Sequence, residues 1–198
     1  MLKQLFKISI ILAGLIFISG CTRSLIETRP HTSTNFGIAE SFAMKGITKM
    51  RVAVLPFRNY ARSGNIGTHI SDEFSIQVLK TGRFDVVERN QIEKIVNEQK
   101  LKDDKDYQSF GKILGVEGLF VGSVIKYDPS LRNPVCGLAV RLVDVETGNN
   151  LWACEEIFYG QDAEIQALVP SQDAWKVTTD IDYLTRLLCE SIAQTLNY

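Results

Sequence analysis

The residues that could do acid–base or nucleophilic chemistry are few. The chain has two histidines, and one of them, His69, stands three residues before Asp72 near the start of a predicted helix. A serine hydrolase would need this pair to meet a serine in one cleft, and no pattern in the sequence marks such a serine. We expect His69 and Asp72 to lie on a solvated helix face, and we expect the protein not to be an enzyme.

Motifs for metal and phosphate binding are missing from the sequence. It contains no Cys-x-x-Cys pair, no His-x₃-His pair, no Asp-x-Asp-x-Asp loop and no Walker loop. The segment Gly64-Asn65-Ile66-Gly67 opens a predicted helix and could present free amides to an anion. A loop that supplies backbone freedom and a helix cap explains the same four residues, and we favour that reading. We therefore predict no catalytic residue, no metal and no cofactor.

Cys21 is the residue whose neighbours indicate a defined reaction. Two lysines precede an apolar run at residues 8–18, which is shorter than the roughly 20 residues of a bilayer crossing and typical of a signal peptide. The tetrad Ile-Ser-Gly-Cys at 18–21 resembles the bacterial lipobox. That resemblance implies cleavage before Cys21 and attachment of diacylglycerol to its sulfur. Thr22 stands where an aspartate would retain such a lipoprotein in the inner membrane, so we expect the periplasmic face of the outer membrane.

These observations divide the chain into three predicted parts. Residues 1–20 are a lipoprotein signal peptide, 21–49 a lipidated tether and 50–198 a periplasmic domain. The tether has a coil span of only about 30 Å, which favours work close to the inner leaflet of the outer membrane. The chain carries 22 basic and 23 acidic residues, and cleavage would remove two lysines. A mildly acidic protein is not expected to bind nucleic acid.

The other cysteines are Cys136, Cys154 and Cys189. Cys136 and Cys154 fall in a predicted hairpin whose pairing places Cys154 opposite residue 141 or so. Cys136 then lies about five residues, or roughly 17 Å, further along the strand. Because a disulfide needs Cα atoms within about 7 Å, we predict no bridge between them. All three are expected to be small buried hydrophobic residues.

Apolar periodicity from Met50 onward predicts the fold class as α/β. Strands are expected at 50–57, 84–87, 119–127, 135–145 and 151–159, and helices at 66–81, 91–99 (after an Asn90 cap), 107–114 and 181–196. This order predicts a single mixed β-sheet with helices packed against it. The sheet should be parallel in its N-terminal part and an antiparallel meander in its C-terminal part.

Five segments in this order resemble the curli secretion lipoprotein family CsgG. They are residues 51–57 (RVAVLPF), 82–89 (GRFDVVER), 91–101, 114–123 (LGVEGLFVGS) and 140–148 (VRLVDVETG). The resemblance covers roughly residues 50–159 and the last helix. It is shared more loosely with the penicillin-binding-protein activator LpoB and the N-terminal domain of TolB. It implies the fold but no single function, because the family includes pores, activators and accessory proteins.

The resemblance also implies a ring of subunits that contribute hairpins to an outer-membrane pore, and here the sequence departs from it. Residues 128–134 offer seven residues with two prolines, and residues 160–180 carry charges and Pro170 that break a lipid-facing alternation. We expect a pore-less, non-enzymatic relative, a candidate homo-oligomer that serves the assembly or secretion of an envelope structure. The alternative is an LpoB-like regulator of a peptidoglycan synthase.

The two tryptophans have different expected roles. Trp152 lies on a predicted strand and is expected to pack inside the domain. Trp175 lies in a predicted loop with Leu168 and Val169, and aromatic anchors of this kind dominate many protein contacts. These three residues are the candidate contact site for an envelope protein partner, which the sequence does not identify.

Overall fold

The structure is a computed structural model of the chain. It describes residues 33–39, 49–61, 64–99 and 107–197, all of which belong to one compact unit, His31–Tyr198. Cys21, the predicted signal peptide and much of the predicted tether lie outside the described residues.

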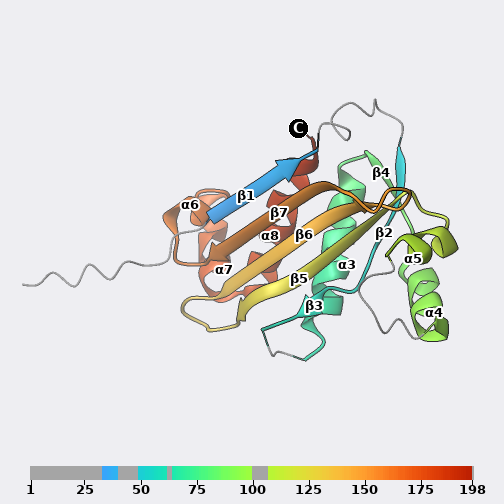
Figure 1. Ribbon diagram of the computed structural model, residues 1–198. Coiled ribbons are helices and arrows are strands. Elements are labelled where there is room, and N and C mark those ends of the chain that lie inside the picture. Colours follow the sequence, from blue (N-terminus) through green and yellow to red (C-terminus); the bar gives the residue numbers. More distant parts are fainter. Residues whose placement is uncertain (1–32, 40–48, 62–63, 100–106, 198) are drawn as a thin grey trace, which may run out of the picture. The chain divides into compact units, whose positions relative to one another are not determined.

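One mixed sheet of seven strands organises the described chain (Figure 1). The strand order is β1-β7-β6-β5-β2-β4, and the short β3 also pairs with β5. Strands β2, β4, β5 and β3 are mutually parallel where they pair, whereas β5, β6, β7 and β1 pair antiparallel. The predicted division into a parallel part and an antiparallel meander is confirmed. The strands are β1 Ser33–Ile38, β2 Met50–Val54, β3 Arg58–Asn59, β4 Phe84–Val86, β5 Gly118–Asp128, β6 Val135–Asp144 and β7 Asn150–Tyr159.

Helices cover the two faces of the sheet unequally. Helices α3 (Ile66–Lys80) and α8 (Ile181–Gln194) lie side by side on one face, where their apolar stripes pack against the strands. Helices α4 (Arg89–Gln99) and α5 (Tyr107–Leu114) pack on the other face against the end of β2 and the start of β5. The shorter helices are α6 Ala163–Gln166, η2 Ser171–Asp173, α7 Ala174–Thr179 and η3 Thr195–Asn197.

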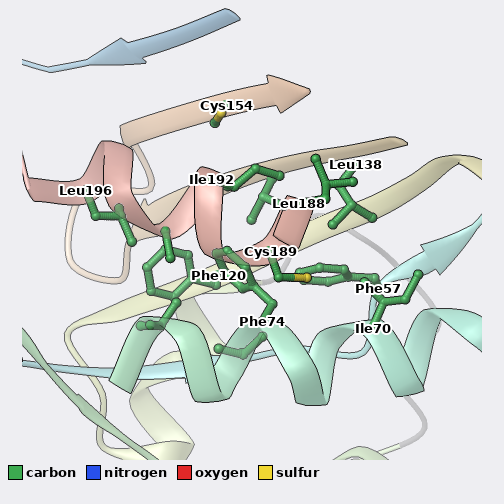
Figure 2. Packing of buried hydrophobic residues seen from close by; sticks show 14 of the residues in the cluster. Phe57, Ile70, Phe74, Phe120, Leu138, Cys154, Leu188, Cys189, Ile192 and Leu196 are labelled. Atoms are coloured by element: carbon green, nitrogen blue, oxygen red, sulfur yellow. The ribbon is translucent and has the colours of Figure 1, made fainter. Parts of the chain in front are cut away.

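A row of aromatic rings holds the larger core together. Phe74 of α3 packs on Phe57 and Phe120, with ring centroids 5.6 and 5.4 Å apart, and Phe120 lies 6.0 Å from Trp152. Figure 2 shows this cluster between the helices and the strands. Trp152 is 1% exposed, and its indole N–H donates to the Thr195 hydroxyl at 3.0 Å. The expectation that Trp152 packs inside is therefore confirmed.

The register of the hairpin places the cysteines as expected. Cys154 lies opposite Val140, and Cys136 lies opposite Phe158, so the two cysteines are offset by four residues, or about 13 Å, along the strands. Cys136, Cys154 and Cys189 are free and buried.

The structure also contains elements that the sequence did not predict. Strand β1 pairs with β7 over six residues. Its first three residues, Ser33, Thr34 and Asn35, are polar, and main-chain hydrogen bonds hold the strand to the sheet edge. Helix α4 begins at Arg89, so Asn90 lies inside the helix and the predicted capping box is wrong. The predicted loop at 160–180 folds into α6, η2 and α7.

Candidate functional site

The predicted contact residues lie in the connection between β7 and α8. Trp175 on α7 is 61% exposed and Leu168, just after α6, is 59% exposed. Val169 is partly buried and packs against the main core. Two of the three candidates are therefore open to a partner, and the third fixes the connection to the domain.

The position of Trp175 relative to the sheet is fixed by close packing. Val177, two residues further along α7, is fully buried in the core. A Cβ at Gly160 would meet the Val177 carbonyl oxygen at 2.4 Å and the Pro134 ring at 2.9 Å. Glycine is therefore required where the end of β7 passes between α7 and the β5–β6 turn. Helix α7 cannot move away from the sheet without breaking this packing.

A third exposed apolar residue, Leu131, lies in the β5–β6 turn and is 76% exposed. The turn is tied to the β7–α6 connection, because the Gly160 N–H donates to the Pro134 carbonyl at 2.9 Å and the Gln161 side chain donates to the Arg132 carbonyl. Leu131 was not among the contact residues predicted from the sequence. The available signal was a large apolar side chain in a turn bounded by two prolines.

These connections meet at one end of the sheet. Strand β1 begins with Ser33 opposite Ile157, and β6 begins opposite the last residue of β7, Tyr159. We call this the tether end; Figure 1 shows α6 and α7 at the same end of the sheet as the start of β1. We call its three exposed apolar side chains the apolar tips: Leu131, Leu168 and Trp175.

A cation and a second ring flank Trp175. The Lys176 ammonium lies 5.9 Å from the Trp175 ring centroid and 5.6 Å from that of Tyr183. It also pairs with Asp173 at 2.7 Å, and this hydrogen bond raises the pKa of Lys176. Lys176 thus stays charged beside the exposed indole.

The tether end is acidic. Segments 128–134 and 160–182 together hold six acidic residues and two basic ones: Asp128, Asp162, Glu164, Asp173, Asp180 and Asp182 against Arg132 and Lys176. Such a surface does not attract an anionic partner through its charge. Contacts made here depend instead on the apolar tips.

A second candidate surface lies on the sheet face that α4 and α5 cover only in part. Among the described residues, a shallow depression of about 510 Å³ opens over β5, β6, β7 and β1. Small residues form part of its lining, including Ala139, Ala153 and Gly37, and the charged Arg141 and Glu155 also lie there. The arrangement suits a flat contact with another protein surface or an extended segment. This depression was not predicted from the sequence.

His69 and Asp72 are exposed on α3 and do not act on one another. The His69 Nε2 atom lies 4.0 Å from an Asp182 oxygen, and Asp72 pairs with Arg89 at 3.1 Å. Within the described ranges, no cluster of three His, Cys, Asp or Glu side chains could hold a metal ion.

The buried thiols are poor nucleophiles near neutral pH. Burial raises the pKa of Cys136 and of Cys154 to about 12. It also raises the pKa of Cys189 well above the ordinary thiol value. Because the thiolate is the reactive form, these three residues act as packing side chains.

The Gly64–Gly67 segment has a structural explanation. Gly64 has a φ of +45°, a conformation that glycine adopts at little cost. A Cβ at Gly67 would lie 2.0 Å from the Phe57 carbonyl oxygen. The Asn59 side chain donates to the Gly64 carbonyl and accepts from the Ala61 N–H, both at 2.9 Å. These contacts support the loop interpretation over an anion site, but Asn65, the N-cap residue of α3, makes no side-chain capping bond.

Comparison with known families gives one match. The family model described as "Curli production assembly/transport component CsgG" matches residues 32–151. No curated protein sequence matches the chain. None of the helices in the described part is long and apolar enough to span a membrane.

Solved structures with a similar fold come from several bacteria. The PelC dodecamer from Paraburkholderia phytofirmans is 13% identical with a TM-score of 0.55, and the match covers 84% of this chain and 97% of that one. Lipoprotein GNA1162 from Neisseria meningitidis is 14% identical with a TM-score of 0.54, covering 75% and 97%. At such identities these likenesses show the fold and not the function. The C-terminal domain of LpoB from Salmonella enterica, with a TM-score of 0.40, is too distant to support an argument.

Proposed function

The chain belongs to the CsgG family, and from that premise we propose that it is a non-enzymatic accessory protein of the bacterial cell envelope. Lipid on Cys21 anchors it to the periplasmic face of the outer membrane. There it works as a homo-oligomer in the assembly or secretion of an envelope structure.

The observation that carries this proposal is a family fold with two exposed contact surfaces. Its described thiols are buried, and His69 and Asp72 contact other charged side chains. The apolar tips are exposed at one end, and the depression over β5, β6 and β7 opens on one face. The described thiols are buried with a raised pKa. His69 and Asp72 face different carboxylate and guanidinium partners.

The open sheet face supports the oligomer. Its lining combines small residues with the charged side chains of Arg58, Arg141 and Glu155, so a second copy could meet it with charges of complementary sign. The similar PelC structure is described as a dodecamer. Native mass spectrometry of the full chain in detergent tests the proposal, and we expect a defined multiple of the subunit mass.

A matched pair of variants locates the interface. Ala153→Arg places a long cation on the open face and is expected to dissociate the oligomer. Thr68→Arg adds the same charge to the exposed surface of α3 and should leave it intact. A wild-type chain that stays monomeric at high concentration would contradict the oligomer and favour regulation of a peptidoglycan synthase by a monomer.

The lipid anchor has its own test. Mass spectrometry of the N-terminal peptide from the native protein should show a chain that begins at Cys21 with diacylglycerol on its sulfur. An unmodified Cys21, or a chain that retains residues 1–20, would contradict the anchor.

A further inference from the structure

We propose that the tether end of the domain rests on the lipid bilayer itself, with the apolar tips inserted in its interfacial layer. This inference rests on the lipid anchor of the proposed function. It assigns to Trp175 and Leu168 a lipid contact, where the sequence suggested a protein partner.

The first support is the short connection between the anchor and the sheet. Cys21 and Ser33 are 12 residues apart, which gives a coil span of about 19 Å. Strand β1 begins at the tether end. The 11 residues of β5 separate this end from the opposite one by about 36 Å. A domain turned with its opposite end toward the membrane would need the connection almost fully extended, which favours the tether end over the opposite end as the one that faces the bilayer.

The second support is the chemistry of the apolar tips. Trp175 is a residue type enriched at membrane–water interfaces, where the ring is buried and the N–H stays hydrated. Leu168 is exposed in the same β7–α8 connection as Trp175, and Leu131 is exposed in the β5–β6 turn at the same end. Three exposed apolar side chains from two connections suit shallow insertion in a deformable lipid surface.

The third support concerns charge. The tether end carries six acidic and two basic residues in the segments 128–134 and 160–182, so anionic lipid repels it. Insertion is therefore driven by apolar contact. It should occur on phosphatidylcholine alone and should not weaken when the salt concentration rises, in contrast to binding by basic patches.

The two tryptophans make the test direct. Trp152 is 1% exposed and lies in the core, whereas Trp175 is 61% exposed, so lipid-borne quenchers can reach only Trp175. The acylated full chain is reconstituted into phosphatidylcholine vesicles whose acyl chains carry bromine close to the headgroup. We expect the Trp175 emission to be quenched, and Trp175→Phe, which retains only Trp152, to show no quenching. Equal quenching in the two proteins, or none in the wild type, would overturn the proposal.

Matched leucine variants test whether the tips act together. Leu168→Gln and Leu131→Gln should each reduce quenching of Trp175, and together they should shift the inserted fraction by about tenfold or more. Leu79→Gln is the control, because Leu79 is 58% exposed on α3 and lies near the opposite end of the sheet. A loss of quenching that is equal in Leu79→Gln and the tip variants would contradict a specific docking end.

Acylation is measured on the same samples, which separates the two proposals. Quenching in a sample whose Cys21 is unmodified would support the docking end and overturn the anchor. An acylated protein without quenching would leave the anchor in place and overturn the docking end.

Discussion

Replacing Gly67 with alanine should destabilise the domain, although alanine is the better helix former. Gly67 is the second residue of α3, and its added Cβ would lie 2.0 Å from the Phe57 carbonyl oxygen. Side chains do not tolerate approaches below 3.0 Å, so the two backbones must separate by about 1 Å. The same helix carries Ile70 and Phe74 into the core, and that packing is disturbed with it.

The expected magnitude follows from two opposing contributions. Overpacking against the backbone costs about 3 kcal/mol, the upper part of the usual range, and alanine recovers at most about 1 kcal/mol of helix propensity. The free energy of unfolding should therefore fall by about 2 kcal/mol. For a domain of this size, that lowers Tm by about 4–8 °C.

Urea unfolding followed by far-UV circular dichroism measures the effect. Gly37→Ala is the matched control, because a Cβ there meets nothing within 4 Å, and its change should stay within about 0.5 kcal/mol. A Gly67→Ala protein as stable as the wild type, or more stable, would refute the close approach of α3 to the β2–β3 connection. It would also favour the alternative interpretation of the Gly64–Gly67 segment as an anion site.

Four further predictions concern the buried thiols, the core and the start of α8. Iodoacetamide at pH 8 should leave Cys136 and Cys154 unlabelled in the folded protein and label them after unfolding. Burial raises the pKa of these two thiols from 9.0 to about 12, so the folded state binds their protons more tightly than the unfolded state does. The free energy of unfolding should therefore hold below about pH 9 and fall as the pH rises toward 12. Trp152→Phe removes the hydrogen bond to Thr195 and part of a buried ring, and it should cost about 2 kcal/mol in urea unfolding. Asp180 accepts two main-chain N–H bonds at the start of α8, so Asp180→Ala should cost about 1 kcal/mol and Asp180→Asn much less.

The sequence predicted the elements whose stability comes from burial. The apolar spacing of Ile70, Phe74 and Val78 predicted α3, and all three side chains are fully buried. The hairpin pairing placed Cys154 opposite residue 141 or so, and the structure has it opposite Val140. In these elements one periodic stripe fixes both the secondary structure and the face that packs.

Elements stabilised mainly by main-chain hydrogen bonds were not predicted. Strand β1 begins Ser33-Thr34-Asn35 and reads as a polar tether, yet it completes the sheet edge along β7. Strand β3 spans only two residues, which is too short to show an alternation. The contact that creates each of these strands lies far away in the chain.

The candidate site was predicted in its residues but not in its geometry. Trp175 and Leu168 stood out as apolar residues in a polar segment, and both are exposed. That their connection meets the β5–β6 turn at the end where β1 begins depends on the register of three strands. Register is a tertiary property, so local sequence could not bring these groups together.

The pairing of β1 with β7 has a mechanical consequence. Strand β1 starts at the tether end and is hydrogen-bonded to β7 from Ser33 to Ile38. A force that pulls the preceding residues outward from this end acts along the strand axis, at right angles to the inter-strand bonds. All hydrogen bonds between β1 and β7 then bear the force together and must break at once. A force perpendicular to the strand would instead break them one at a time. The domain should therefore stay folded when the predicted tether is under tension.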